Sequence, residues 1–318
     1  MYTLAEPPLF TRLRPAKRVL IAGAGGGFDV YAGLPLATAL RAQGKEVHLA
    51  NLAFSDLNRL GLDDWLSPDV ARVRPGSAGD DAYFPERTLA RWLASRGLPA
   101  VVHAFPRVGV QPVRDAYRDL VAHLGVDAVV LVDGGTDILL RGDEAGLGTP
   151  EEDMTSLASV AALEGVDRLV VSLGFGIDAF HGVCHAHVLE NLAALDREGG
   201  YLGALSIPAA SPEAEAYLDA VAHAQRTTPE RPSIVHGQVA AALRGEFGNV
   251  QFTSRTAGQE LFVNPLMGVY FTVDLAMLAA GVGYLDDLAT TNTAAEVARV
   301  IEAHRDRAKR RPWRALPH

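Results

Sequence analysis

The sequence predicts an α/β protein with a three-layer, Rossmann-like fold and a mostly parallel sheet. Short apolar runs alternate with helical stretches, an order that is typical of a parallel sheet, and several of the runs end in glycines. The chain of 318 residues is 48% hydrophobic and 21% charged, an ordinary composition for a globular protein. We expect an N-terminal extension over residues 1–17 and one Rossmann-like domain over residues 18–318, with an irregular insertion around residues 51–110.

The first part of the chain predicts a strand, a loop, a helix and a second strand. The opening apolar run ends in Gly23, which indicates a buried strand entering a loop. A helical stretch then closes at Gly44, and another apolar run follows. Prolines punctuate the next segment, where we expect one helix among short pieces. The predicted elements are, in order, strand 18–22, helix 31–42, strand 46–50 and helix 86–95.

Regular alternation resumes in the second part of the chain. Thr149 is predicted to cap a helix, with Pro150 at its first position and Glu152 completing a capping box. Asn264 precedes a proline, which predicts a turn. The predicted elements are helix 113–124, strand 128–132, helix 150–163, strand 168–172, helix 185–195, strand 201–206, helix 213–225, helix 238–244, strand 250–253 and a solvated final helix, 296–311.

Three of the predicted strands run into loops of one form, in which glycines and one bulkier residue precede an aspartate. These loops are residues 25–29, 133–137 and 174–178. The carboxyl ends of parallel strands share one edge of a sheet, where ligands bind, so we expect the loops to converge. Glycine allows backbone N–H groups to approach an anion such as phosphate. The candidate ligand-binding residues are Gly23, Gly25, Gly26, Gly27, Gly134, Gly135, Thr136, Arg141, Gly174 and Gly176.

Aspartates beside a phosphate would repel it unless a cation lay between them. Mg²⁺ is usually held by one or two carboxylates together with water and phosphate oxygens. We therefore expect Asp133 and Asp137 to bind Mg²⁺, which would bridge to a nucleotide or a phosphorylated small molecule. Arg141 stands nearest the glycine loops in sequence, and the loop 141–144 that it begins could cover the site. The plainer alternative is that these glycines and aspartates are ordinary turns and helix caps.

Four residues are candidates for catalysis. Asp29 or Asp178 would orient a nucleophile or water, and His181 or His185 would act as acid or base near neutral pH. In a helix, Asp178, His181 and His185 would share one face, so they could also share a metal or relay a proton. The zinc-protease spacing is incomplete, because its glutamate would fall at Gly182. Histidines that merely bond to neighbouring loops remain the alternative.

Phosphoryl or nucleotidyl transfer by an intracellular enzyme is the leading functional prediction, and two alternatives remain. A NAD(P)- or flavin-dependent oxidoreductase or lyase would use the same pocket, although Phe28 stands where the dinucleotide fingerprint needs its third glycine. A non-catalytic, metabolite-binding module is the second alternative. No Gly-Lys-Ser/Thr or Gly-x-Ser-x-Gly sequence occurs, which excludes a P-loop ATPase and disfavours a serine hydrolase.

Composition limits the partners. A formal charge of -9 argues against nucleic acid, because binding to phosphate backbones needs a basic face. The single cysteine, Cys184, excludes an intramolecular disulfide, and we expect the reducing cytoplasm. Residues 1–14 lack the pattern of a secretory signal, and no apolar stretch is long enough to cross a membrane. A small-molecule ligand is expected, and a homo-oligomer is allowed.

Several short motifs carry a resemblance to a known family. They are Leu-Val-Asp-Gly-Gly-Thr-Asp at 131–137, Arg-Gly-Asp-Glu at 141–144, Gly-Thr-Pro-Glu-Glu-Asp at 148–153, Gly-Phe-Gly at 174–176 and Tyr-Phe-Pro-Glu at 83–86. In these motifs the chain resembles the family designated domain of unknown function 1152, from about Val19 to the final helix. The resemblance implies a single Rossmann-like α/β body. It brings no activity, so the functional prediction rests on the loops themselves.

Overall fold

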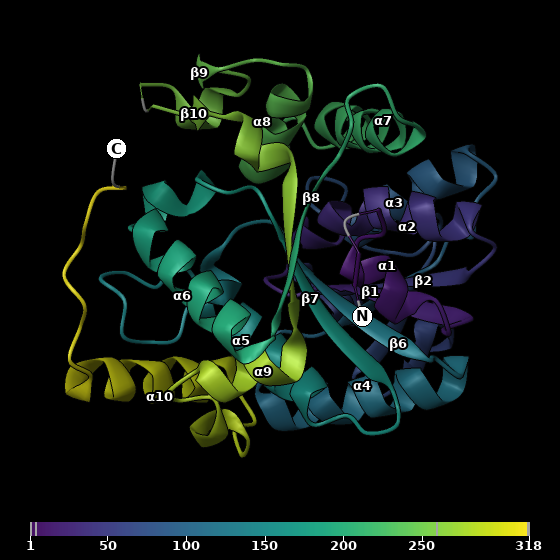
Figure 1. Cartoon of the computed structure of the whole chain (residues 1–318). Helices are drawn as coiled ribbons and strands as arrows, with labels where there is room; N and C mark the ends of the chain where they lie inside the picture. The colour runs from purple at the N-terminus through teal and green to yellow at the C-terminus, as the bar shows by residue number, and fades with distance from the viewer. Residues whose placement is uncertain (1, 4, 259, 317–318) are drawn as a thin grey trace.

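The computed structural model describes residues 2–3, 5–258 and 260–316. It is an α/β protein with a large, mostly parallel central sheet and helices on both faces, so the predicted Rossmann-like fold class is confirmed (Figure 1). Among the described residues, nine strands pair in the order β3-β4-β5-β2-β1-β6-β7-β11-β8. Their bounds are β1 Arg18–Gly23, β2 Glu46–Leu52, β3 Trp65–Ser67, β4 Val70–Val73, β5 Val102–Phe105, β6 Ala128–Asp133, β7 Asp167–Leu173, β8 Tyr201–Ser206 and β11 Val269–Asp274.

The order of the parallel strands reverses between β1 and β6. From β1 the chain moves outward in one direction to β2 and β5, and later in the other direction to β6 and β7. The pairings β1–β2, β2–β5, β1–β6 and β6–β7 are all parallel. The β1 and β6 strands lie side by side, with Gly23 opposite Val132. At such a reversal, the loops leaving the two carboxyl ends diverge and open a crevice. The fold therefore places the first and second glycine loops on either side of this crevice.

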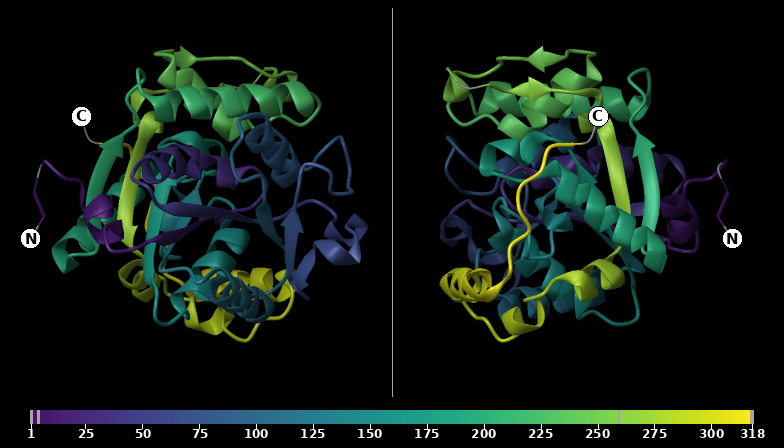
Figure 2. Two further views of the ribbon diagram at one scale, coloured as in Figure 1. Left: turned by 90° about the vertical axis from the view of Figure 1, so that its right-hand side faces the viewer. Right: turned by 60° about the vertical axis from the view of Figure 1, so that its left-hand side comes forward.

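Two layers of helices cover the sheet because both of its faces are apolar. One face packs against α1 Pro8–Leu13, α2 Leu34–Ala42, α3 Pro85–Ser95, α7 Pro212–Thr227 and α8 Ile234–Leu243. The other packs against α4 Val110–Leu124, α5 Pro150–Ala161, α6 His185–Glu198, α9 Leu275–Gly281 and α10 Ala294–Arg307. Figure 2 shows the layers edge on, with α7 and α2 on one side of the strands and α4 and α10 on the other. Loops follow the carboxyl ends of the parallel strands at this edge of the sheet.

The segment around residues 51–110 is more regular than expected. It contains β5, which continues the parallel sheet beside β2, and β4, which pairs antiparallel with β5. Pro75 and Pro99 lie between elements and Pro85 is the first residue of a helix, so these prolines mark element boundaries rather than irregular structure. The predicted helix of this segment is confirmed as α3, Pro85–Ser95.

Two strand predictions near the carboxyl end differ from the structure. The strand expected at 250–253 is wrong: the neighbouring β9, Gly248–Asn249, pairs instead with β10, Phe262–Val263, as a separate antiparallel pair. The strand β11 was not expected, because its apolar sequence runs without a break into α9. Asp274 makes the boundary, since its side chain accepts a hydrogen bond from the backbone N–H of Met277 at 3.0 Å.

Part of the predicted N-terminal extension packs on the sheet. Leu9 and Leu13 of α1 are fully buried in the apolar cluster, and Arg12 forms ion pairs with Asp167 and Asp274. The burial of these leucines places α1 in one of the two helical layers. Among the described residues, no helix combines the length and the apolar character needed to cross a bilayer.

Candidate functional site

A cavity of about 950 Å³ opens at the carboxyl ends of β1 and β6, where the strand order reverses. All three glycine–aspartate loops contribute to its wall, together with the starts of α5 and α8 and the segments that carry Phe54, Tyr83, Arg107 and Arg255. Its lining residues are Gly25, Gly26, Gly27, Phe28, Asp29, Phe54, Tyr83, Arg107, Asp133, Gly134, Asp137, Thr149, Glu151, Glu152, Asp153, Asp178, His181, Glu230, Arg231, Ser233, Ile234, Val235 and Arg255. A volume of this size accommodates a nucleotide-sized ligand.

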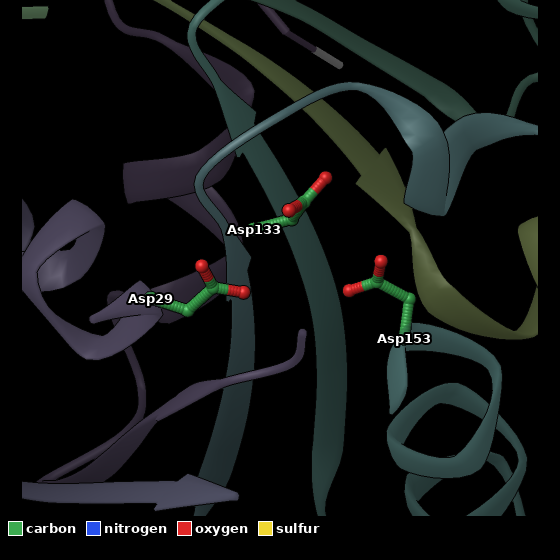
Figure 3. Close-up of side chains that lie close together, drawn as sticks. All are labelled: Asp29, Asp133 and Asp153. Carbon is green, nitrogen blue, oxygen red and sulfur yellow. The ribbon is translucent and has the colours of Figure 1, made fainter. Parts of the chain in front are cut away.

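Three carboxylates meet in this cavity. Asp29 follows the first glycine loop, Asp133 ends β6, and Asp153 lies in the first turn of α5. Each offers a carboxylate oxygen, and these oxygens all lie within 4.8 Å of one another. Figure 3 shows the three side chains facing a shared space from three different elements. The sheet and α5 thus bring together groups that are far apart in the sequence.

Two of these carboxylates have oxygens without hydrogen-bond partners. Asp133 is 3% exposed and Asp153 is 2% exposed, yet Oδ2 of Asp133 and Oδ1 of Asp153 accept no hydrogen bond within the described structure. Burial, and then the neighbouring carboxylates, raise the pKa of both residues well above its ordinary value. A buried, unpaired carboxylate is costly unless a proton or a cation compensates its charge. Carboxylate oxygens are among the ligands that a hard divalent cation such as Mg²⁺ takes.

The third carboxylate, Asp29, is fixed by the glycine loop. The backbone N–H of Gly25 donates a hydrogen bond to Oδ2 of Asp29 at 2.6 Å. A side chain at Gly25 would place its Cβ 2.6 Å from that oxygen and 2.9 Å from Oδ1 of Asp153, so this position has no space for one. Loss of hydration raises the pKa of Asp29 to about 8, against the lowering effect of the Gly25 and Gly134 N–H groups. Gly25 thus allows the first loop to approach the carboxylates closely.

Asp137 and Asp178 line the same cavity, but each also holds a neighbouring loop. Oδ2 of Asp137 accepts hydrogen bonds from N–H and Oγ1 of Thr149, at 2.9 and 3.2 Å. Oδ2 of Asp178 accepts them from N–H and Oγ1 of Thr136, at 2.6 and 3.1 Å. Burial raises the pKa of both aspartates. The group of oxygens within 4.8 Å of one another thus joins Asp133 to Asp29 and Asp153, whereas Asp137, its predicted partner, accepts the hydrogen bonds of Thr149 at the start of α5.

The predicted capping box at the start of α5 is wrong. The hydroxyl of Thr149 donates to Asp137 and accepts no hydrogen bond from the backbone N–H groups of the helix. Glu152 instead forms an ion pair with Arg107. The side chain of Thr149 is thus directed to Asp137 and not to the helix, while Pro150 still occupies the first helical position.

The predicted glycines divide into two groups. Four of them line the cavity: Gly25, Gly26, Gly27 and Gly134. The others, Gly23, Gly135, Gly174 and Gly176, lie behind this wall, where they allow close packing. A Cβ at position 23 would lie 2.1 Å from Oδ1 of Asn51, and one at position 135 would lie 2.8 Å from Oδ2 of Asp178. Thr136 contacts the site only through its hydrogen bonds to Asp178.

The two histidines do not share a helix with Asp178, so the predicted common helical face is wrong. Asp178 and His181 lie in a short 3₁₀ turn, Ile177–His181, which ends at Gly182 with φ of +81°. The helix α6 begins only at His185. His181 lines the cavity, whereas the His185 ring packs against Phe175 with ring centroids 5.1 Å apart. A residue in the left-handed region ends a helical run, so the glycine separates the two histidines.

Arg141 and its loop lie outside the cavity wall. The Arg141 guanidinium donates to the carbonyl oxygen of Asn191 at 3.2 Å. Glu144, which is fully buried, accepts hydrogen bonds from the backbone N–H groups of Arg141 and Gly142 and forms an ion pair with Arg311 at 2.8 Å. This loop is thus fastened to α6 and to the segment after α10, and it does not cover the cavity. The arginines that do line the cavity are Arg107, Arg231 and Arg255.

The sequence interpretation missed Asp153 and these three arginines as site residues. Asp153 belongs to an acidic first turn, Glu151, Glu152 and Asp153, which is ordinarily explained by the helix dipole. Its presence in the Gly-Thr-Pro-Glu-Glu-Asp motif was the signal that could have found it. The arginines stand in loops without a motif, so only the tertiary fold assigns them to the cavity.

A comparison with known families confirms the family that the chain resembles. No curated protein matches the chain. Residues 66–305 match the family described as Protein of unknown function (DUF1152), and the matched region contains Asp133, Asp153 and Asp178. The first glycine loop and Asp29 precede the matched region. Because the match spans more than half of the sequence, the chain belongs to the DUF1152 family.

Proposed function

We propose that this chain is an enzyme that binds Mg²⁺ at Asp29, Asp133 and Asp153 and uses it to hold a nucleotide or phosphorylated small molecule for phosphoryl or nucleotidyl transfer. One observation carries the proposal: Asp29, Asp133 and Asp153 each offer an oxygen within 4.8 Å of the others at the reversal of strand order, and Asp133 and Asp153 each have a buried oxygen without a hydrogen-bond partner. Ligands of open parallel sheets bind at this place. We propose the cytoplasm as its location, on the ground of its single cysteine.

The charge of the cavity indicates why a cation is needed. Eight carboxylate residues line it, against three arginines. A phosphate entering this surrounding would be repelled, and Mg²⁺ offsets the repulsion by binding carboxylates and phosphate oxygens together. Ligand binding should therefore depend on the divalent cation. Binding of a phosphate compound in the absence of a divalent cation would therefore contradict the proposal.

The remaining residues of the cavity supply the other parts of a transfer reaction. Mg²⁺ held by Asp29, Asp133 and Asp153 would supply positive charge that offsets the charge of the phosphate group. An attacking hydroxyl or water oxygen forms the new P–O bond as the bridging P–O bond breaks, and the leaving oxygen keeps that electron pair. Asp178, fixed by Thr136, orients the attacking group, and His181 accepts its proton. His185 takes no part in this scheme because it packs against Phe175.

A ligand screen tests the proposal. We expect chelator-treated protein to be stabilised against heat by phosphate compounds only when Mg²⁺ is present, among ATP, GTP, NAD, NADP, FAD and sugar phosphates. A ligand at 100 times its Kd contributes about 2.7 kcal/mol, which a thermal-shift assay detects. Phosphorus NMR of the stabilising mixtures should then reveal a new phosphorylated product. His181→Ala should reduce turnover about 100-fold and leave the Kd of the ligand within threefold.

The screen also distinguishes the two alternatives. Stabilisation by NAD or FAD without metal would replace the proposal with a redox function. Stabilisation that needs Mg²⁺, with no product from any compound, would indicate a metabolite-binding module. If none of the phosphate compounds shifts the melting temperature, the glycine loops serve only the fold and the proposal fails.

A further inference from the structure

Two arginines of the cavity lack acidic partners in a surrounding rich in carboxylates. Among the described residues, no carboxylate lies within ion-pair distance of Arg231 or Arg255, although eight carboxylate residues line the same cavity. Arg255 donates to the carbonyl oxygen of Pro232 at 2.6 Å, and the Arg231 guanidinium lies 6.0 Å from the centre of the Tyr83 ring. Glu230, which also lines the cavity, pairs with neither of them. Arg231 and Arg255 are thus unpaired with the carboxylates of the cavity, unlike Arg107, which forms an ion pair with Glu152.

The glycine loop extends between the two charged regions. At its first residue, a Cβ on Gly25 would meet the carboxylates of Asp29 and Asp153; at its third, a Cβ on Gly27 would lie 2.9 Å from the hydroxyl of Tyr83. Consecutive Cα atoms are about 3.8 Å apart, so the loop separates these points by at most about 8 Å. A span of up to about 8 Å can hold a chain of two or three phosphate groups.

Tyr83 marks the change of charge along the loop. Loss of hydration and then the carboxylates of Glu86 and Asp29 raise the pKa of Tyr83, whereas the guanidinium groups of Arg255 and Arg231 lower it. Loss of hydration is the largest influence and raises this pKa, so the hydroxyl keeps its proton at neutral pH and can donate a hydrogen bond. It is therefore a donor between the cation site and the arginines.

The start of α8 adds to the cationic end. Ser233, Ile234 and Val235 line the cavity at the first turn of this ten-residue helix, whose N-terminus carries a partial positive charge. The side chain of Ser233 already accepts a hydrogen bond from the backbone N–H of His236, at 3.1 Å. The helix therefore reinforces the field of Arg231 and Arg255 and is not needed as a site by itself.

We propose that Arg231, Arg255 and the hydroxyl of Tyr83 form an anion subsite at the far end of the glycine loop, and that the ligand carries a di- or triphosphate chain. One phosphate binds the cation held by Asp29, Asp133 and Asp153, and the chain crosses the loop to the arginines. Guanidinium groups bind phosphate through charge-assisted hydrogen bonds of good directionality. This inference rests on the proposed function and narrows its substrate class to polyphosphates, free or attached to a nucleoside.

Calorimetric titration of the Mg²⁺-saturated protein tests the subsite. The probes are orthophosphate, pyrophosphate, tripolyphosphate, AMP and ATP. Tripolyphosphate should bind at least about tenfold more tightly than orthophosphate, since a hydrogen bond to a charged group contributes on the order of a tenfold change in affinity or more. An Arg231→Ala, Arg255→Ala double variant should lose this difference and keep the Kd values for orthophosphate and Mg²⁺ within twofold.

Three further variants control the test. Arg231→Lys should keep part of the preference for the longer chain, because it preserves the charge, and Tyr83→Phe should lose part of it. Arg197→Ala, an exposed arginine of α6, should change nothing. ATP binding more tightly than tripolyphosphate identifies a nucleoside polyphosphate as the ligand, whereas equal affinities identify the phosphate chain alone. Both results support the subsite.

Two results overturn the inference, and they differ in what they say of the proposed function. The subsite is contradicted if the intact protein binds orthophosphate and tripolyphosphate with equal affinity, or if the double variant still prefers the longer chain. Either result leaves the proposal of Mg²⁺-dependent phosphate binding standing. If no phosphate probe binds to the Mg²⁺-saturated protein, both the subsite and the proposed function are contradicted. The series of chain lengths uses the unaltered protein, so it decides the question even if a variant fails to fold.

Discussion

Asp133→Asn should lower the affinity for Mg²⁺ at least about 100-fold. Loss of a partner that only supports a ligand typically costs 10- to 100-fold in metal affinity, and Asp133 is a direct ligand in the proposed site. The same variant should be more stable than the unaltered protein at pH 8 without metal, because it removes one carboxylate from a group whose members raise each other's pKa. Isothermal calorimetry gives the affinity, and thermal melts with and without chelator give the stability.

Asp119→Asn is the matched control, since Asp119 is an exposed aspartate of α4 on the opposite side of the sheet from α8. It should change neither the Kd for Mg²⁺ nor the melting temperature by more than about 1 °C. A fall in stability of the Asp133→Asn variant at pH 8, with unaltered Mg²⁺ affinity, would show that Asp133 serves the fold and would contradict the proposed site.

The metal-free protein should lose stability as the pH rises from 7 to 9. The folded-state pKa of Asp29 is raised to about 8, and those of Asp133, Asp153 and Asp178 are also raised. A carboxylate with a raised folded-state pKa stabilises the fold below its unfolded pKa, and this contribution is lost as the pH rises through the folded-state value. For each carboxyl that is still protonated in the folded state, the free energy of unfolding falls by about 1.4 kcal/mol per pH unit. Thermal melts in chelator measure the fall.

Buried histidines do not oppose this loss of stability between pH 7 and 9. Burial lowers the pKa of His103 and His236 to about 4, so their contribution is lost only as the pH falls below about 6.5. Above pH 7 they are neutral in both states. Mg²⁺ needs ionised ligands, so it should raise the melting temperature more at pH 9 than at pH 7. Asp133→Asn should reduce both this effect of Mg²⁺ and the loss of stability of the metal-free protein with rising pH. A metal-free protein with level or rising stability between pH 7 and 9 would contradict the account.

The general position of the site was predictable from the sequence. The apolar runs before Gly23 and Asp133 have the length and punctuation of buried parallel strands, and loops leaving such strands share one edge. That physical rule brings Asp29, Asp133 and Asp178 into one cavity, as the structure has them. The rule uses only local pattern and the geometry of parallel sheets, so it needs no knowledge of which helices cover the sheet.

The identity of the carboxylates was not predictable in full. Asp137 and Asp153 are both acidic residues close to Asp133 in sequence, and local pattern favours the nearer one. The structure turns Asp137 toward Thr149 and brings Asp153 to Asp29, because α5 packs across the end of β6. The choice between them is made by the packing of a helix, which is a tertiary contact.

The strands β5 and β11 and the cavity arginines were missed for similar reasons. The β11 strand continues without a break into the apolar residues of α9, and only the cap at Asp274 separates them. Arg141 is nearer to the glycine loops in sequence than Arg231, yet its loop is held by Asn191 and Arg311 on α6 and the segment after α10. The charge of a side chain can be read from the sequence, whereas the cavity that the side chain lines depends on contacts between distant parts of the chain.

Crystals soaked in Mn²⁺ and measured at the manganese absorption edge test the central claim most directly. Mn²⁺ takes the same oxygen ligands as Mg²⁺ and gives an anomalous signal that Mg²⁺ does not. A strong anomalous peak between the carboxylates of Asp29, Asp133 and Asp153, with oxygen distances of about 2.1 Å, is the expected result. An electron-density map at millimolar Mn²⁺ in which these carboxylates are well ordered, with no anomalous peak between them, would contradict it.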